Sequence, residues 1–167
     1  MQHNIRPERP EDVSVIREVT TAAFAVAEHS SGTEAAIVDA LRTAGALSIS
    51  LVATVEGEVV GHVAFSPVTL DGADLGWYGL GPVSVRPDLH GQGIGAELIR
   101  AGLERLKALG ARGCVVLGDP AYYPRFGFAQ DPAIQYEGVP PEYFMALSLD
   151  GSKAAGKVAY HSGFSAT

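Results

Sequence analysis

The sequence predicts one α/β domain on a mixed β-sheet, in which an antiparallel meander leads into a parallel strand pair. Three segments rich in β-branched residues, 49–55, 59–70 and 77–85, are joined by short turns and predict the meander. A helical period over residues 93–109 precedes a short apolar run at 113–117. Strand–helix–strand order makes that run a strand parallel to 77–85, because such crossovers join parallel neighbours.

Two helices are predicted ahead of the meander. A short first strand at residues 3–6 precedes Pro10, which suits the first turn of a helix. Apolar residues at helical spacing extend this helix to about Glu28. The second helix begins at Thr33 and ends at Gly45, since glycine commonly follows the last helical residue.

The last third of the chain carries weaker signals. Residues 122–126 predict a short helix, and residues 143–149 and 157–160 predict two further strands. The segment from Pro140 is expected to supply a sheet edge or complete a groove, and a homodimer stays open. The tail from Ser152 is expected to be mobile in part. Its apolar side chains that can dock are Val158, Tyr160 and Phe164.

Pro82 is unusual because it lies within a segment that otherwise indicates a central strand. Proline has no N–H to donate to a neighbouring strand, so we expect a bulge or a splayed strand there. A splayed strand leaves backbone N–H and C=O groups free. An extended ligand that carries amide groups can pair with them.

A glycine-rich loop opens the helix that follows this strand. Gly91, Gly93 and Gly95 carry no Cβ, so a bulky anion can lie against the backbone of residues 90–96. The first N–H groups of the helix and the positive end of its dipole point toward such an anion. The loop therefore predicts a pyrophosphate site.

A dinucleotide-binding fold is one interpretation of this loop, because Gly91-x-Gly93-x-x-Ala96 fits that fingerprint and Asp119 follows at a suitable distance. In that fold, however, the glycines follow the strand at once, whereas residues 86–90 intervene here. Too few residues follow Asp119 for further βαβ units, and no G-K-[ST] sequence indicates a P-loop. Coenzyme A explains more: its pyrophosphate fits the loop, and the two amides of its pantetheine arm fit Val83 and Val85.

Two motifs carry a resemblance to a known family. Val85-x-Pro87-x-x-His90-Gly91-Gln92-Gly93-Ile94-Gly95 resembles the acetyl-CoA signature of the GNAT superfamily of N-acetyltransferases. Tyr123-Pro124-Arg125-Phe126-Gly127-Phe128 is similar to a later segment of that family, and residues 118–128 resemble its YhbS-like branch of predicted acetyltransferases. The resemblance covers roughly residues 4–149. His90 departs from the usual Gln or Arg, and Asp119 stands where many members have Asn.

The resemblance implies a GNAT-type acyl-CoA N-acyltransferase fold in a single domain over residues 1–167. It implies an enzyme that moves the acetyl group of acetyl-CoA to a primary amine by direct attack, with no metal. Tyr123 is implied to be the general acid for the departing thiolate, although an aromatic corner of the core also explains it and Tyr122 is an alternative. The oxyanion donor is implied to be a backbone N–H near Val83 or Ser84. The residues implied to bind the cofactor are Val83, Ser84, Val85, His90, Gly91, Gln92, Gly93, Ile94, Gly95, Ala96, Asp119, Tyr123 and Phe126.

The general base stays open among five side chains and a chain of water molecules. Each candidate also has a structural explanation. By strand alternation His62 shares a face with Val60 and Ala64, where a hydrogen-bonded core histidine is expected. Asp119 can cap the short helix that follows it. The candidates are Glu28, Glu34, His62, Asp119 and Glu142.

Composition and charge disfavour several other classes of protein. The net charge of −7 argues against a nucleic-acid binder and mildly favours a cationic acceptor, such as a small metabolite, an antibiotic, a polyamine or a protein amine. No apolar run reaches the ~20 residues that span a bilayer, and no secretion signal is evident. The single cysteine, Cys114, is expected to be structural, and a cytoplasmic location is expected. The alternative function is a non-catalytic acyl-CoA-binding sensor or interaction module.

Overall fold

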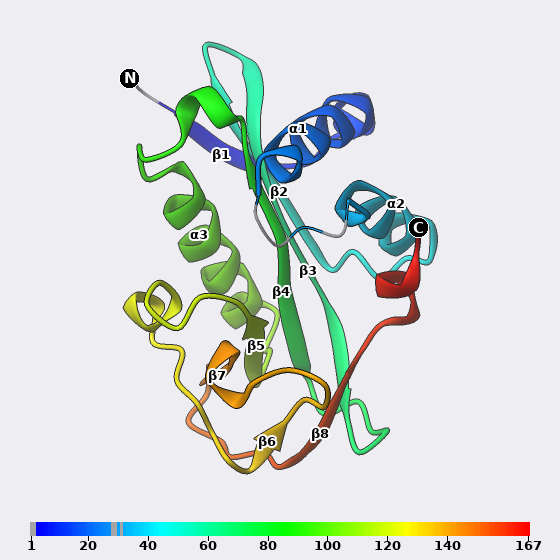
Figure 1. Ribbon diagram of the computed structural model, residues 1–167, viewed down its shortest axis with the longest axis vertical. Helices are drawn as coiled ribbons and strands as arrows, with labels where there is room; N and C mark the ends of the chain where they lie inside the picture. Colours follow the sequence, from blue (N-terminus) through cyan, green and yellow to red (C-terminus); the bar gives the residue numbers. More distant parts are fainter. Residues whose placement is uncertain (1–2, 28–29, 31) are drawn as a thin grey trace.

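The computed structural model describes residues 3–27, 30 and 32–167, and in this part of the chain one mixed sheet lies between helices (Figure 1). The helices are α1 (Val13–Ala25), α2 (Glu34–Thr43) and α3 (Ile94–Ala108). The strands are β1 (Asn4–Pro7), β2 (Ile49–Val55), β3 (Glu58–Leu70), β4 (Trp77–Val85), β5 (Gly113–Leu117), β6 (Ile134–Gln135), β7 (Phe144–Ser148) and β8 (Gly156–Tyr160).

The predicted meander, helix and parallel strand are confirmed. The sheet order is β1-β2-β3-β4-β5-β7, and β4 and β5 are parallel while the other pairs along this path are antiparallel. Helix α1 ends at Ala25, earlier than predicted, and Glu28 lies outside the described residues. Strand β6 was not predicted, because two residues are too few to show a period.

Strands β4 and β5 separate after three residue pairs. They pair at Trp77–Gly113, Tyr78–Cys114 and Gly79–Val115, and β4 then continues to Val85 without β5 beside it. We call the point beyond Gly79 the strand fork. A bulge accompanies it, since Gly81 and Pro82, joined by a cis peptide, together face one residue of β3. Both the bulge and the splay predicted from Pro82 are therefore present.

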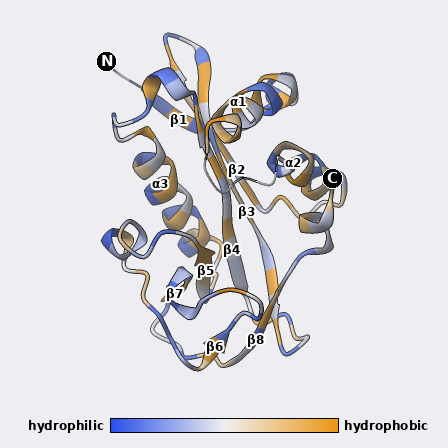
Figure 2. Cartoon of the chain, viewed as in Figure 1, coloured by the Kyte–Doolittle hydropathy of each residue, from blue (hydrophilic) through white to orange (hydrophobic). Residues whose placement is uncertain are grey.

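The two faces of the sheet bury different helices. Leu98 of α3 packs with Phe65 of β3 on one face, whereas Ile16 of α1 and Val38 of α2 pack against Val52 of β2 on the other. In Figure 2 these helices carry both hydrophobic and hydrophilic residues, as expected where one side meets a core. No helix within the described ranges is long and apolar enough to cross a membrane.

The C-terminal segment packs onto the face of the sheet that carries α1 and α2. Strand β7 forms the sheet edge beside β5, as expected for the segment after Pro140. Strand β8 pairs with the end of β3 and with β6, and the 3₁₀ turn Ser162–Ser165 then contacts α2 (Figure 1). The predicted docking of Val158, Tyr160 and Phe164 is confirmed.

Candidate active site

A cavity of about 600 Å³ lies where the end of β4, the start of α3 and the end of α1 meet. It brings together the splayed strand and the glycine loop that the sequence singled out. Gln92 is exposed in the loop and is absent from this lining. The lining residues are Ala23, Phe24, Ala27, Val83, Ser84, Val85, Leu89, His90, Gly91, Gly93, Ile94, Gly95, Ala96, Tyr122 and Arg125.

Beyond the fork, one edge of β4 presents backbone groups that pair with no strand among the described residues. The N–H of Arg86 donates to the carbonyl of Val60 in β3 (2.8 Å). Backbone groups of alternate residues point to the same edge of a strand, so Ser84 also faces β3. Val83 and Val85 therefore turn their N–H and C=O groups away from β3, on the side that β5 has left. These are the two residues that the sequence proposed for an extended ligand.

The glycine loop has a backbone that favours glycine. Gly91 and Gly93 have φ of 81° and 80°, a region that L side chains rarely adopt, and a Cβ at either would meet no atom within 4 Å. No side chain within the described ranges caps the helix that begins after Gly93. Its first N–H groups thus remain available to an anion. The His90 side chain instead folds back, and its Nε2 donates to the carbonyl of Val85 (2.7 Å).

Six residues of this lining were not predicted to bind a cofactor, and two of them, Tyr122 and Arg125, carry polar side chains. Arg125 stacks over the ring of Tyr122 (4.3 Å to the centroid), and its Nε donates to the Tyr122 carbonyl (2.8 Å). The Tyr122 hydroxyl lies near Gly95 at the start of α3. Arg125 is the one Lys or Arg among the described lining residues, and it places a positive charge beside the glycine loop. The position of Arg125 within the motif of residues 123–128 is the sequence feature that could have indicated a role in the site.

A second cavity of about 520 Å³ adjoins the first and shares Phe24, Ala27 and Tyr122 with it. It contains Tyr123 and Asp119, which are absent from the first cavity. Phe126 lines neither of these two cavities. The second cavity is lined by Phe24, Ala27, Ser30, Glu34, Gly118, Asp119, Tyr122 and Tyr123.

Tyr123 belongs to an aromatic cluster and also lines the second cavity. Its ring packs edge-on against Tyr122 (5.1 Å between centroids) and Phe128 (6.1 Å), and it lies against the backbone of Gly118. Burial raises the pKa of Tyr123 to about 12, with smaller contributions from Tyr122, Asp119 and the Cys114 thiol. We find no hydrogen bond of its hydroxyl within the described residues. The phenol thus keeps its proton at neutral pH and can donate it.

Comparison with known proteins identifies the family. The model of the Acetyltransferase (GNAT) family matches residues 15–128. The chain belongs to the GNAT acetyltransferase family. The uncharacterized N-acetyltransferase YhbS of Escherichia coli strain K12 is 44% identical to it over 125 residues, which are 74% of this chain and 72% of that protein.

Solved structures agree with this assignment. A GNAT family acetyltransferase from Brucella melitensis in complex with acetyl-CoA is 52% identical, with a TM-score of 0.88 over 98% of each chain. Escherichia coli YhbS in complex with CoA is 36% identical, also with a TM-score of 0.88, over 99% of this chain and 93% of that one. The GNAT fold and the N-acetyltransferase activity that the motifs implied are confirmed at the level of the family.

The carboxylates considered as general base in this acetyltransferase lie in different places. Glu34 lines the second cavity and accepts a hydrogen bond from the Ser30 hydroxyl (2.8 Å). Asp119 lines the same cavity, and its Oδ1 accepts from the N–H of Ala121 (2.8 Å) in the turn before the 3₁₀ segment. Glu142 is exposed in the turn Pro141–Tyr143 and lies in neither cavity lining.

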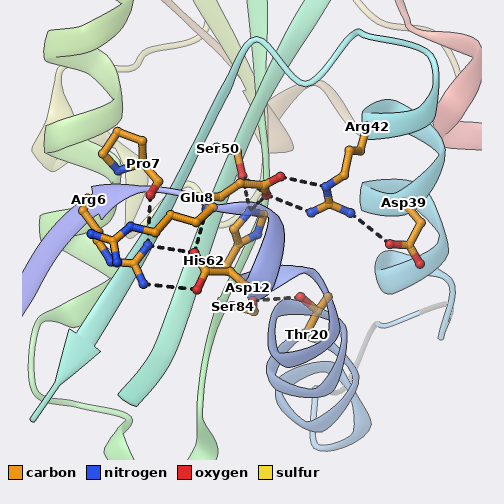
Figure 3. A network of polar contacts seen from close by, with 11 residues as sticks. Arg6, Pro7, Glu8, Asp12, Thr20, Asp39, Arg42, Ser50, His62 and Ser84 are labelled. Carbon is orange, nitrogen blue, oxygen red and sulfur yellow. Dashed lines mark hydrogen bonds and ion pairs between the residues drawn. The ribbon is translucent and has the colours of Figure 1, made fainter. Parts of the chain in front are cut away.

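His62 is fully buried in a polar network (Figure 3) and itself lines neither cavity. Its Nε2 lies 2.8 Å from the hydroxyl of Ser50, which donates to Glu8 (2.5 Å). Arg42 holds Glu8 through two further bonds (2.7 and 2.8 Å). The histidine is therefore a hydrogen-bonded core residue, as expected. The predicted shared face with Val60 is wrong, because a register shift in β2–β3 places Val60 in the cluster under α3.

The network also defines the tautomer of His62. Burial opposes ionisation of Glu8, but hydrogen bonds from Arg42 and Ser50 lower its pKa, so the carboxylate only accepts. Ser50 must then donate to Glu8, and its oxygen accepts the proton carried by Nε2 of His62. Burial lowers the pKa of His62 to about 4, with Glu8 opposing and Arg42 adding to the shift. The imidazole is neutral at pH 7.

Proposed function

We propose that this enzyme transfers the acetyl group of acetyl-CoA to a primary amine by direct attack. The observation that best supports this proposal is that two cavities adjoin. The first joins the free edge of β4 to the glycine loop, and the second, which shares three residues with it, contains Tyr123. Cofactor and acceptor can thus meet beside Tyr123.

The residues of the first cavity fit coenzyme A. The N–H groups of residues 91–96 suit the pyrophosphate, and Arg125 adds a positive charge beside them. The backbone groups of Val83 and Val85 suit the two amides of the pantetheine arm. The complexes of the Brucella melitensis and Escherichia coli relatives with acetyl-CoA and CoA support this arrangement.

The chemical step needs a neutral amine, an oxyanion donor and a proton for sulfur. The amine nitrogen attacks the thioester carbon, and the carbonyl electrons move onto oxygen. Because Val83 turns its N–H to the free edge and Ser84 does not, Val83 is the better of the two predicted donors. The C–S bond then breaks, and Tyr123 gives its hydroxyl proton to the sulfur of coenzyme A.

The acceptor enters through the second cavity, where Glu34 and Asp119 are the carboxylates that can take the proton lost by the amine. A covalent cysteine intermediate is disfavoured. Cys114 has no exposed surface, and burial raises the pKa of its thiol far above the usual range, so it remains a protonated and poor nucleophile.

The test is calorimetric binding of acetyl-CoA together with release of free thiol in a panel of primary amines. Binding with amine-dependent thiol release supports the transferase. Binding without release on any amine supports the non-catalytic acyl-CoA module instead. Absence of binding overturns the assignment of the first cavity.

A further inference from the structure

The second cavity has a lining that suits positive charge. Glu34 and Asp119 contribute two carboxylates to it, and three further lining residues are aromatic. Among the described residues that line it, none is Lys or Arg. Carboxylates attract ammonium groups, and so do the faces of aromatic rings. The ring of Tyr122 already does so within the protein, since the guanidinium of Arg125 lies 4.3 Å from its centroid. The cavity therefore favours cationic groups over neutral or anionic ones.

The two carboxylates are held differently. The Ser30 hydroxyl donates to Oε1 of Glu34 (2.8 Å) and accepts from the N–H of Gly32 (2.9 Å), and Glu34 is half-buried. Asp119 is exposed, and its Oδ1 accepts from the N–H of Ala121 (2.8 Å). Over the part of the chain that the structure describes, Oδ2 of Asp119 makes no hydrogen bond or ion pair. Asp119 can thus bind a ligand through Oδ2 and keep its own bond through Oδ1.

Asp119 lies in the same turn as Tyr123. This turn joins β5 to the 3₁₀ segment Tyr123–Phe126, and the carbonyl of Asp119 accepts from the N–H groups of Tyr122 (3.0 Å) and Tyr123 (3.2 Å). The ring of Tyr123 packs against Gly118, the residue before Asp119. The carboxylate and the phenol therefore come from one short segment and line one cavity. A charge bound by Asp119 is held in the cavity where we place the reaction.

We propose that Asp119 determines acceptor specificity: its carboxylate binds a second positive charge of the acceptor, so the preferred acceptor is a diamine. This proposal rests on the proposed function, in which the amine approaches through the second cavity. One amine of the substrate is neutral and attacks the thioester, while the other stays an ammonium and pairs with Oδ2 of Asp119. Glu34 is then the carboxylate that takes the proton of the attacking amine. A monoamine lacks the second charge, and an amino acid brings a carboxylate that Asp119 repels.

Three acceptors that share a primary amine and a four-carbon chain test this role. They are putrescine, butylamine and 4-aminobutyrate, which end in an ammonium, a methyl group and a carboxylate. Asp119→Asn removes the charge and keeps an oxygen for the N–H of Ala121. We expect it to lower the ratio of kcat/KM for putrescine to kcat/KM for butylamine about 2- to 5-fold, the size expected for an exposed ion pair. It should raise the rate with 4-aminobutyrate relative to butylamine. Comparing ratios between variants cancels differences in the basicity of the amines.

Asp131→Asn is the matched control. Asp131 is also exposed, and its Oδ1 accepts from the N–H of Ala133 (3.0 Å), two residues along, just as Asp119 accepts from Ala121. It lines neither the first nor the second cavity, so the ratio should not change. Salt at about 0.5 M should lower the wild-type ratio, because it screens an exposed ion pair, and should have little effect on the ratio in Asp119→Asn. A structural role of Asp119 would not give this salt dependence.

The other outcomes separate this proposal from the proposed function. An unchanged ratio in Asp119→Asn overturns the specificity role while the transferase stands. An equal loss of kcat/KM with all three amines also overturns it, since Asp119 would then act on the attacking amine. A loss confined to acetyl-CoA affinity overturns it as well, since that indicates a cofactor contact.

Calorimetry covers the case in which the wild type turns over none of the three amines. Putrescine and butylamine are then titrated into the full chain saturated with coenzyme A. If Asp119→Asn weakens putrescine binding and not butylamine binding, the proposed function fails and the charge site stands. Equal binding by both proteins, or no binding of either amine, overturns both.

Discussion

His62 and Tyr123 are both titratable side chains with strongly shifted pKa values, and their surroundings differ in their hydrogen bonds. Burial lowers the pKa of His62 to about 4, and its Nε2 is hydrogen-bonded to Ser50, which joins it to Glu8 and Arg42. Burial raises the pKa of Tyr123 to about 12, but Tyr123 lines a cavity, and its hydroxyl makes no hydrogen bond within the described residues. A shifted pKa thus indicates function only where the protein has not already used the group.

The largest effect that tests this comparison is expected from Tyr123→Phe. The variant keeps the ring against Gly118 and removes the acidic proton. We expect kcat to fall about 10²- to 10⁴-fold, the usual contribution of a general acid, with acetyl-CoA binding retained. Thiol-release kinetics and calorimetry measure the two quantities. Tyr122→Phe is the control, and full activity of Tyr123→Phe with loss of activity in Tyr122→Phe would exchange their roles.

For His62 we expect a pH-dependent effect on stability and no effect on catalysis. The pKa of about 4 in the folded state lies below the ordinary value near 6.5, so the unfolded chain binds more protons between these values. Stability is therefore full above pH 6.5 and falls as the pH drops toward 4. From pH 7 to pH 5 the free energy of unfolding should fall by about 2 kcal/mol from this residue.

Urea unfolding of His62→Gln measures that contribution, because glutamine does not titrate. The variant should lose most of the difference between pH 7 and pH 5 and keep kcat within about 2-fold once folded. Tyr123→Phe should show the wild-type dependence, since its phenol does not titrate in this range. A large drop in kcat for folded His62→Gln would contradict the structural role and return the histidine to the list of bases.

The two regions also show what the sequence could predict. Strand β4, its bulge at Pro82 and the glycine loop follow from patterns within a few residues, and all are confirmed. The His62 network joins β1, α2, β2 and β3, and no local pattern reports such pairings. The face of Val60 was predicted wrongly because alternation assumes a regular ladder, and a register shift interrupts it. Likewise, the contact of Tyr160 with Gly79 depends on β8 crossing back over β3.

A smaller effect than that of Tyr123→Phe is expected at Arg125, which uses only some of its hydrogen-bond donors within the protein. Arg125 donates through Nε to the carbonyl of Tyr122, and its side chain also lines the first cavity, which we propose to hold coenzyme A. Arg125→Gln should weaken acetyl-CoA binding about 3- to 10-fold, and less at high salt, because a charged contact to phosphate is lost. Calorimetry at two salt concentrations measures this. Arg100→Gln, which removes a cation over Phe126 outside this cavity, is the control and should have a smaller effect.

The smallest effect is expected at His90, which replaces the Gln or Arg usual in the family. Its Nε2 already donates to the carbonyl of Val85, so the side chain supports the turn from β4 into the loop. In the proposed function the pyrophosphate is held by backbone N–H groups, which a change of side chain leaves in place. His90→Gln retains a donor for the Val85 carbonyl, so the Kd of acetyl-CoA should stay within about 2-fold. A loss as large as that of Arg125→Gln would show that a side chain already hydrogen-bonded to the protein can still contribute to cofactor affinity. Hydrogen bonding within the protein, as seen at His62, would then not be enough to exclude a side chain from function.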